Sequence, residues 1–303
     1  MSGMAGRRSR ISGRRFAAPL SPLDPRIAPW RPDLADIALA GLVAVPHYAA
    51  PVLRSVAAES AMLHTRPEAD SEAASELLHG ETFAVLEEAR GWAWGQARAD
   101  GYVGYVRTEA LAPALGPPAG PVWDATVGPG DALRFAAPAV KAPVVGVLPA
   151  GSRLHVREAD EAFVMIADGS FAGQFVHRRH LLPAGGAADP VEVAKQFLGA
   201  PYRWGGRTRA GVDCSGLVQM AWRLCGRPAR RDSDMLVADA GPEVPPEERA
   251  RGDLAWWPGH VGLLVDSGTL LHANAHWMAV VVEPLADVVA RIGTPARCRR
   301  PMA

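Results

Sequence analysis

The stretch GVDCSGLVQMAWRLCG, residues 211–226, carries the strongest fold signal in the chain. Asp213 is a favourable N-cap residue and Gly226 a favourable residue just beyond a helix C-terminus. Apolar side chains recur between them at helical spacing, at Leu217, Met220, Ala221 and Leu224. We therefore predict a helix whose first turn contains Cys214. Unpaired N–H groups and the helix dipole favour an anion there, which predicts a lowered pKa for the Cys214 thiol.

The elements on either side of this helix predict an α+β domain. Upstream, Asp189 followed by Pro190 predicts the start of another helix, which ends by Gly199. Downstream, strand-like apolar runs lie at 254–257, 260–265, 269–275 and 279–282. Helices followed by a meander of strands are typical of the α+β class.

Two histidines are candidate partners for the cysteine. A thiolate nucleophile needs a base, and the base needs an orienting group. His260 opens one strand-like run and His272 lies in the next, so we expect their imidazoles to meet across paired strands. Asn274 lies on the same face as His272 in a regular strand, and it is the alternative orienting residue, as in Cys-His-Asn sites.

Residues 80–113 and 151–183 are two similar copies of one turn-rich β pattern. Matching positions, at an offset of 71 and then 70, are Val85 with Val156, Trp92 with Phe163, and Leu111 with Leu181. Each copy is too short for a thick sandwich, so we predict two small barrels of five or six strands. A proline-rich linker at 114–121 and a glycine-rich one at 184–188 separate the parts.

These patterns divide the chain into four segments. They are an N-terminal arm at 1–48, a first β module at 49–115, a second at 120–184, and the α+β domain at 189–303. The arm is rich in arginine, but no apolar stretch typical of a signal peptide follows.

Composition narrows the function classes. Of 303 residues, 49% are hydrophobic, and 32 basic residues balance 32 acidic ones, so the chain lacks the field of a nucleic-acid binder. No apolar window is long enough for a membrane helix. Three well-separated cysteines imply no disulfide framework. We expect a cytoplasmic protein with neither nucleic acid nor membrane as a partner; the sequence does not indicate an oligomeric state.

Three motifs together resemble the NlpC/P60 cysteine peptidases: AspCysSerGly at 213–216, GlyHisValGly at 259–262 and LeuLeuHisAla at 270–273. The resemblance covers residues 189–283 and has that family's order of Cys, His and His. The first β module is similar to bacterial SH3 domains in its Gly-Glu, Gly-Trp and Gly-Tyr-Val-Gly-Tyr-Val motifs. The resemblance implies two SH3-like β-barrels followed by a papain-like α+β domain.

Two SH3-like repeats before such a domain further resemble the γ-D-glutamyl-L-diamino acid endopeptidases. That resemblance implies a small murein peptide substrate with a free N-terminal L-Ala, whose ammonium needs buried carboxylates. The catalytic residues it implies are Cys214, His260 and His272. The substrate-binding residues it implies are Tyr202, Trp204, Asp213, Ser215, Asp232 and Ser233, joined by Glu72 and Tyr102 of the first β module.

The implied reaction is acyl transfer without a cofactor or metal. The Cys214 thiolate attacks the γ-carbonyl of D-Glu, and His260 as imidazolium protonates the leaving amine before water resolves the thioester. The Cys214 backbone N–H faces the oxyanion, with the Tyr202 hydroxyl as a second donor.

Three other functions compete with this one. A secreted endopeptidase acting on intact peptidoglycan stems needs a signal sequence, which the sequence pattern does not indicate. A non-catalytic wall-binding protein has no use for the Cys and His set. A zinc site built from Cys214, His260 and His272 lacks a ligand pair at short spacing.

Overall fold

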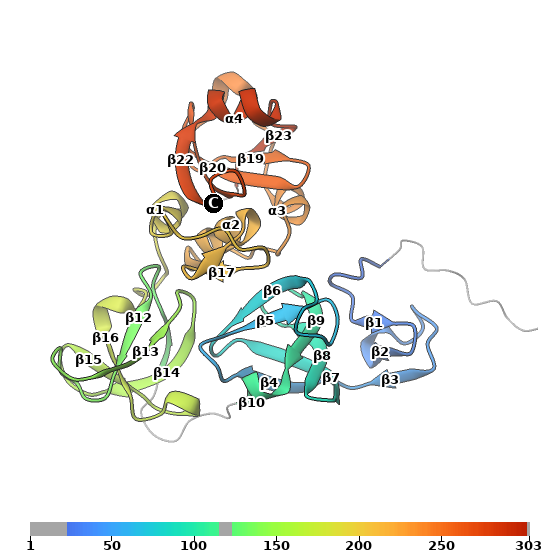
Figure 1. Ribbon diagram of the computed structural model, residues 1–303, viewed down its shortest axis with the longest axis vertical. Coiled ribbons are helices and arrows are strands. Elements are labelled where there is room, and N and C mark those ends of the chain that lie inside the picture. The colour runs from blue at the N-terminus through green and yellow to red at the C-terminus, as the bar shows by residue number, and fades with distance from the viewer. Residues whose placement is uncertain (1–22, 115–122, 302–303) are drawn as a thin grey trace, which may run out of the picture.

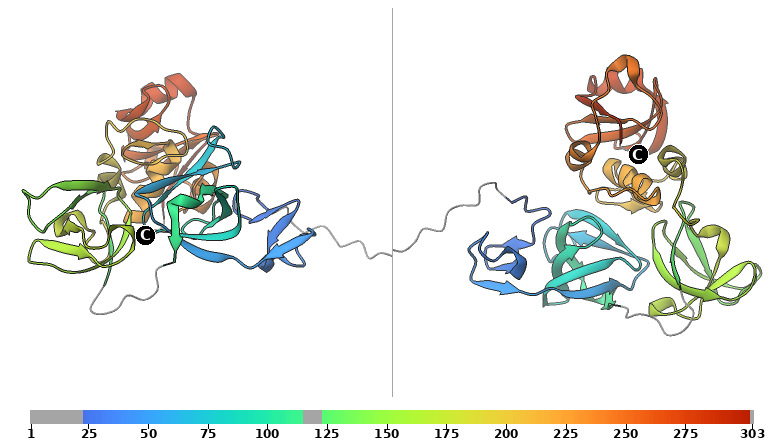
Figure 2. Two further views of the ribbon diagram at one scale, coloured as in Figure 1. Left: turned by 60° about the horizontal axis from the view of Figure 1, so that its bottom comes forward. Right: turned by 180° about the vertical axis from the view of Figure 1, so that it is seen from behind.

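The computed structural model describes residues 23–114 and 123–301. Two β modules lie next to each other, and a mixed α and β domain lies across both of them (Figure 1). The view from behind in Figure 2 shows the same arrangement. Within the described residues, no helix is long and apolar enough to cross a membrane.

The segment predicted as an N-terminal arm is folded from residue 23 onward, which differs from the prediction; residues 1–22 lie outside the described residues. Its small sheet consists of β1 (Trp30–Arg31), β2 (Leu34–Asp36) and β3 (His47–Ala49), with a 3-10 turn, η1 (Ile37–Leu39). The Arg31 guanidinium lies 4.6 Å from the ring centroid of Trp94 and donates to Glu87 at 2.5 Å. The sequence pattern missed this sheet because its supporting surface belongs to the next module.

The first β module is a seven-stranded sheet, one strand more than the largest number predicted. Its elements are β4 (Val52–Val56), β5 (Ser60–His64), β6 (Ala73–Leu78), β7 (Thr82–Ala89), β8 (Trp92–Ala97), β9 (Val103–Arg107), η2 (Thr108–Ala110) and β10 (Leu111–Pro113). They are hydrogen-bonded in the order β10-β4-β7-β8-β9-β5-β6. Leu63, Phe83 and Val106 are fully buried in its core.

The second β module is a six-stranded sheet, within the predicted range. Its elements are β11 (Trp123–Thr126), β12 (Ala132–Phe135), β13 (Val144–Leu148), β14 (Arg153–Glu158), β15 (Phe163–Ile166), η3 (Gly169–Phe171), β16 (Phe175–His177) and η4 (Arg178–His180). They are hydrogen-bonded in the order β11-β14-β15-β16-β12-β13. The predicted linker at 114–121 lies outside the described residues except for Ala114.

The C-terminal domain has the predicted α+β arrangement. Its helices are α1 (Pro190–Lys195), α2 (Cys214–Leu224), α3 (Ser233–Asp239) and α4 (Leu285–Ile292), with a 3-10 turn, η5 (Pro246–Glu248). Its strands are β17 (Arg207–Thr208), β18 (Gly211–Val212), β19 (Leu254–Trp257), β20 (His260–Asp266), β21 (Thr269–Asn274), β22 (Ala279–Pro284) and β23 (Arg297–Arg299). The main sheet has the antiparallel order β22-β21-β20-β19-β23, and α2 packs against β20 and β21.

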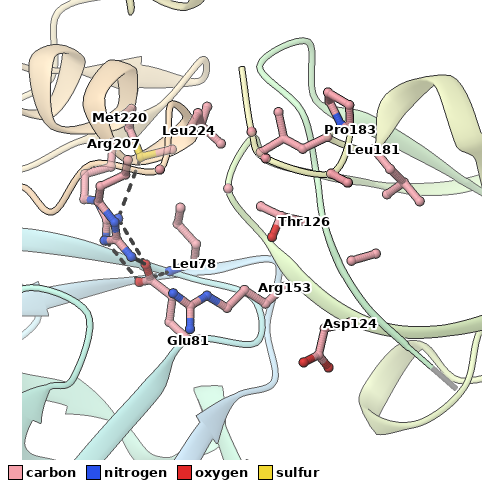
Figure 3. Close-up of a pocket in the computed structure, with 18 residues that line it drawn as sticks. Leu78, Glu81, Asp124, Thr126, Arg153, Leu181, Pro183, Arg207, Met220 and Leu224 are labelled. Carbon is pink, nitrogen blue, oxygen red and sulfur yellow. Dashed lines mark hydrogen bonds and ion pairs between the residues drawn. The ribbon is translucent and has the colours of Figure 1, made fainter. Parts of the chain in front are cut away.

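A buried ion pair joins this domain to the first β module. Arg207 and Glu81 are fully buried and share two hydrogen bonds of 3.0 Å, which Figure 3 shows beside a cavity of about 530 Å³. Burial acts to raise the pKa of Glu81, but Arg207 and Arg223 outweigh it and lower that pKa to about 2. Neither Cys214 nor a histidine lines this cavity, so the pair acts in docking the modules.

Candidate active site

The N-terminus of α2 places Cys214. Its N-cap residue, Asp213, accepts hydrogen bonds from the backbone N–H groups of Gly216 (2.7 Å) and Gly205 (2.8 Å). A Cβ at Gly216 would collide with the carbonyl oxygen of Gly206, so the first turn of the helix requires glycine there. These contacts hold Cys214 at the first helical position, where it lines a cavity of about 250 Å³.

The pKa of this thiol corrects one prediction. Burial raises the pKa of Cys214 to about 12, and the neighbouring Asp213 carboxylate adds to the rise. The backbone N–H groups of Val261 and Ser215 act in the opposite direction but are outweighed. The predicted lowering of the pKa is therefore wrong, because desolvation of a buried thiolate exceeds the stabilisation from the helix terminus. At neutral pH Cys214 is a thiol and needs a base to attack a carbonyl.

His260 and His272 form a hydrogen-bonded pair on β20 and β21. His260 Nε2 lies 2.7 Å from His272 Nδ1, so the two imidazoles meet across the strands. Gly262 permits this approach, since a Cβ there would lie 3.0 Å from the Cβ of His272. Val261, which follows His260, turns its backbone N–H toward Cys214, and this brings the pair close to the thiol.

A carboxylate continues the chain of hydrogen bonds. Glu283 Oε1 lies 2.7 Å from His272 Nε2. Burial acts to raise the pKa of Glu283, but bonds from Arg291 and His272 outweigh it, so Glu283 is ionised and only accepts. His272 Nε2 therefore carries a proton, and its Nδ1 accepts from the Nε2–H of His260. This leaves His260 Nδ1 with a free lone pair as the basic atom.

The pKa of His260 fits the role of a base. Burial, together with the neighbouring His272 and Arg291, lowers it to about 4, although Glu283 acts in the opposite direction. At neutral pH the imidazole is uncharged and can accept the proton of Cys214. The site therefore pairs a neutral thiol with a neutral imidazole, in place of the thiolate and imidazolium expected from the sequence.

Asn274, the alternative orienting residue, contacts His272 rather than His260. Its Nδ2 lies 3.0 Å from His272 Nε2, and its Oδ1 accepts from the Trp277 backbone N–H at 2.8 Å. Because His272 Nε2 donates to Glu283, the amide of Asn274 does not donate to the same atom. The direct contact with His260 is made by His272.

Sequence reasoning missed Glu283. It is the next-to-last residue of the otherwise apolar strand β22 and pairs with Leu270, two positions from His272, so both side chains share one face of the hairpin. Arg291 of α4 (2.6 Å) and the Trp277 indole (3.3 Å) also donate to its carboxylate. A single acidic residue on that face of the strand was the available signal.

Arg231 is a buried cation beside the nucleophile that was not among the predicted site residues. Its guanidinium donates to both oxygens of Asp213, at 3.0 and 2.5 Å, and to the hydroxyl of Ser215 at 2.7 Å. Its Nε donates to Ser75 of the first β module at 3.1 Å. Asp213 and Ser215 line the cavity, but their hydrogen bonds hold the surroundings of Cys214 in place.

Asp232 follows Arg231 and lines the same cavity as Cys214. It occupies the N-cap position of α3 but makes no capping bond. Its Oδ2 instead accepts from the Tyr102 hydroxyl (3.0 Å) and from Arg26 Nη1 (2.8 Å). Burial raises the pKa of Asp232, although these donors act to lower it. Ser233 lines the cavity next to it, so α3 presents two polar groups to a ligand.

The remaining predicted residues lie at or beside this cavity. The Trp204 indole donates to Glu72 Oε1 at 3.1 Å, and both side chains are exposed. Tyr202 is half-buried, and burial together with Cys214 and Asp213 raises the pKa of its hydroxyl. Of the predicted substrate-binding residues, all except Tyr202 line the cavity that contains Cys214.

A second cavity of about 340 Å³ adjoins the histidine pair. His260, His272, Trp257 and Arg291 are among its lining residues. Thus Cys214 lines one cavity, and the imidazoles of His260 and His272 line the other. In residues 23–114 and 123–301, no group of three or more His, Cys, Asp or Glu side chains is arranged to hold a metal ion.

A thiol at a helix N-terminus, with two linked imidazoles and a carboxylate on the adjoining sheet, defines a cysteine–histidine nucleophile site on an α+β domain. Residues 199–290 match the NlpC/P60 family, and residues 63–111 match the bacterial dipeptidyl-peptidase Sh3 domain. The chain therefore carries an SH3 domain followed by an NlpC/P60 domain.

Curated relatives match part of the chain. Dipeptidyl-peptidase 6 of Lysinibacillus sphaericus is 35% identical over 97 residues, which cover 32% of this chain and 36% of that protein. Gamma-D-glutamyl-L-lysine dipeptidyl-peptidase of Bacillus subtilis (strain 168) is 30% identical over 131 residues, which cover 39% of this chain and 44% of that protein. The chain thus spans less than half the length of these relatives.

A solved structure shares the fold over most of the chain. It belongs to an NlpC/P60 family protein from Bacillus cereus ATCC 10987 and matches with a TM-score of 0.70 at 18% identity. The match covers 83% of this chain and 100% of that one, so it includes more than the NlpC/P60 domain.

Proposed function

We propose that this chain is a cysteine endopeptidase that hydrolyses the γ-D-glutamyl–diamino acid bond of free murein peptides with an N-terminal L-Ala. The observation that carries the proposal is one cavity that holds both the nucleophile Cys214 and the carboxylate Asp232. The name of the Bacillus subtilis relative, a γ-D-glutamyl-L-lysine dipeptidyl-peptidase, supports the bond type. Such an activity serves the recycling of wall peptides.

The charge of the cavity favours a cationic end on the substrate. Four carboxylates line it, on Glu72, Asp213, Asp232 and Asp234, against the two guanidinium groups of Arg26 and Arg231. Arg231 is neutralised by Asp213, with which it shares two hydrogen bonds. The surplus of negative charge suits the ammonium of a free N-terminal residue rather than an acylated amine.

The reaction begins with transfer of the Cys214 proton to His260 Nδ1 as the sulfur attacks the γ-carbonyl carbon of D-Glu. The oxyanion of the tetrahedral intermediate faces the Cys214 backbone N–H at the start of α2. The His260 imidazolium then gives its proton to the leaving amine as the C–N bond breaks. Water attacks the thioester with His260 as base, and the proton returns to the Cys214 sulfur as it leaves.

The two cavities define the orientation in which the substrate binds. The acyl half, L-Ala-γ-D-Glu, belongs in the cavity with Cys214 and Asp232, because it carries the ammonium. The diamino acid belongs in the second cavity, because His260 lines it and has to protonate the leaving amine.

We also infer that the second β module is a second SH3-like domain. In the first module, strands β4 to β9 follow the spatial order β4-β7-β8-β9-β5-β6, and the six strands of the second have the same connectivity, β11-β14-β15-β16-β12-β13. The antiparallel bridge between Val127 and Leu181 matches the pair Val56 and Leu111 of the first module. Equal connectivity and equal register support a duplicated fold.

The test is hydrolysis of L-Ala-γ-D-Glu-diaminopimelate beside its N-acetylated form, with Cys214→Ala as the inactive control. We expect cleavage of the free peptide and a loss of roughly 10- to 100-fold in kcat/KM on acetylation, which is the worth of one charged hydrogen bond. Equal cleavage of both forms contradicts the ammonium site. Release of stems from intact peptidoglycan at a similar rate favours a wall-acting endopeptidase, and cleavage of none of these substrates overturns the proposal.

A further inference from the structure

Arg26 reaches the cavity of the nucleophile, although it precedes both matched domains. Its backbone carbonyl accepts from the Val103 N–H at 2.8 Å, and the carbonyl of Ile27 accepts from the Gln96 side chain at 2.7 Å. The N–H of Ile27 also returns to the carbonyl of Asp24 at 3.1 Å. This turn is therefore fixed to the first β module, and its arginine has a defined position.

All three nitrogens of the Arg26 guanidinium donate to carboxylates. Nη1 donates to Asp232 (2.8 Å) and Asp234 (3.0 Å), Nη2 donates to Asp234 (2.9 Å) and Asp24 (2.8 Å), and Nε donates to Asp24 (3.1 Å). The hydrogen bonds that Arg26 donates to Asp234 and Asp24 raise the pKa of its guanidinium above its already high value. The side chain is 37% exposed, so this permanent charge contacts the Asp232 carboxylate and also reaches solvent.

The two oxygens of Asp232 have different surroundings. Oδ2 accepts from Tyr102 and from Arg26, whereas Oδ1 accepts no hydrogen bond from the described part of the chain. The Asp232 carboxylate accepts no hydrogen bond from the backbone N–H groups at the start of α3, since it makes no capping bond. One acceptor atom is therefore left for a ligand, and the guanidinium of Arg26 lies next to it.

We propose that Arg26 determines substrate specificity by closing the cavity beyond Asp232, so that the ligand has to end at its first residue. This inference rests on the proposed function, in which Asp232 binds the ammonium of that residue. A peptide longer by one residue brings an uncharged amide to Asp232 and its added residue against the guanidinium. An L-Ala ammonium instead fits at Oδ1, where the carboxylates of Asp24, Asp232 and Asp234 outnumber the single charge of Arg26.

The experiment compares kcat/KM for L-Ala-γ-D-Glu-diaminopimelate with that for the same peptide extended by one L-Ala at its N-terminus. The proteins are the wild type, Arg26→Ala, Arg26→Lys and the control Arg54→Ala. Arg54 is a partly exposed arginine of the first β module that pairs with one carboxylate, Glu88. We expect the ratio of long to short peptide to rise about tenfold or more in Arg26→Ala. The ratio should rise less in Arg26→Lys, which keeps the positive charge but not the planar guanidinium that bonds to several carboxylates. It should stay unchanged in Arg54→Ala.

The outcomes separate this inference from the proposed function. If the wild type prefers the short peptide and Arg26→Ala keeps the same preference, the inference is overturned and the proposed function stands. Cleavage of neither peptide by the wild type overturns both. Should Arg26→Ala fail to fold, judged by its thermal melt, the ratio in Arg26→Lys decides, and an unchanged value counts against the inference.

Discussion

Replacing Glu283 by Gln removes the charge at the end of the hydrogen-bonded chain while keeping the shape of the side chain. The carboxylate accepts from His272 Nε2 at 2.7 Å, and this contact sets the tautomer of both imidazoles. A Gln amide can present either its oxygen or its N–H groups to His272. In the second case His272 reverses its tautomer and donates from Nδ1 to His260 Nε2, so His260 carries its proton on Nδ1 and loses the basic lone pair there.

The size of the effect follows from that one contact. A hydrogen bond to a charged group contributes about 1.5–3 kcal/mol, which corresponds to about a 10- to 100-fold change in rate. We therefore expect Glu283→Gln to lower kcat/KM for the free murein peptide by about 10- to 100-fold, measured by release of the diamino acid. Glu247→Gln is the matched control, because Glu247 is exposed on the same domain.

The pH profile separates positioning from a general loss of structure. Glu283 raises the pKa of His260, whose value is about 4. Without the carboxylate, that pKa falls further, since Arg291 is left without its partner. A base works only above its own pKa, so the acid limb of kcat/KM should move to lower pH while the plateau falls. A plateau equal to that of the wild type, or an acid limb that moves to higher pH, would refute the reasoning.

Three other perturbations test separate contacts. Since burial raises the pKa of Cys214 to about 12, its alkylation by iodoacetamide should rise about tenfold per pH unit above neutrality; a plateau near neutral pH would indicate a preformed thiolate. Asp232→Asn should lower kcat/KM for the free peptide by about 10- to 100-fold and leave the N-acetylated form nearly unchanged, and an equal loss on both would argue against an ammonium site. Arg207→Met should lower the free energy of unfolding, measured in urea, by about 3–5 kcal/mol, because it leaves Glu81 buried without its main partner. Arg54→Ala should change the free energy of unfolding by less than about 1 kcal/mol, and equal effects of the two variants would contradict the docking role.

The parts of the site that depend on local sequence could be predicted. The start of α2 depends on Asp213 and on residues within three positions of it, and the structure begins the helix there. The meeting of His260 and His272 needed only two adjacent strands and a short turn, and it is confirmed. Patterns of this kind are set by hydrogen bonds and side-chain periodicity over a few residues.

The parts that depend on packing between segments could not be predicted. Arg26 and Asp232 are 206 positions apart, and Ser75 and Arg231 are 156 apart, so no local pattern relates them. The prediction of a lowered thiol pKa for Cys214 was wrong for a similar reason. The helix terminus is a local feature, but the burial that outweighs it comes from the whole fold. The solvent exposure of Cys214 is determined only once the modules have assembled.

The base and the substrate-binding cavity depend on different modules, and this has a consequence for the kinetics. The chain of hydrogen bonds from His260 to Glu283 lies within one domain, whereas the cavity around Asp232 also needs Tyr102 of the first β module and Arg26 of the N-terminal segment. Loosening the contact between modules therefore separates the groups that select the substrate before it disturbs the base. A weakened interface should raise KM for free peptides and relax the preference for a free amine, while kcat at saturating substrate changes less. Under the proposed function, specificity thus depends on the contacts between the modules, and the chemistry depends on the last domain alone.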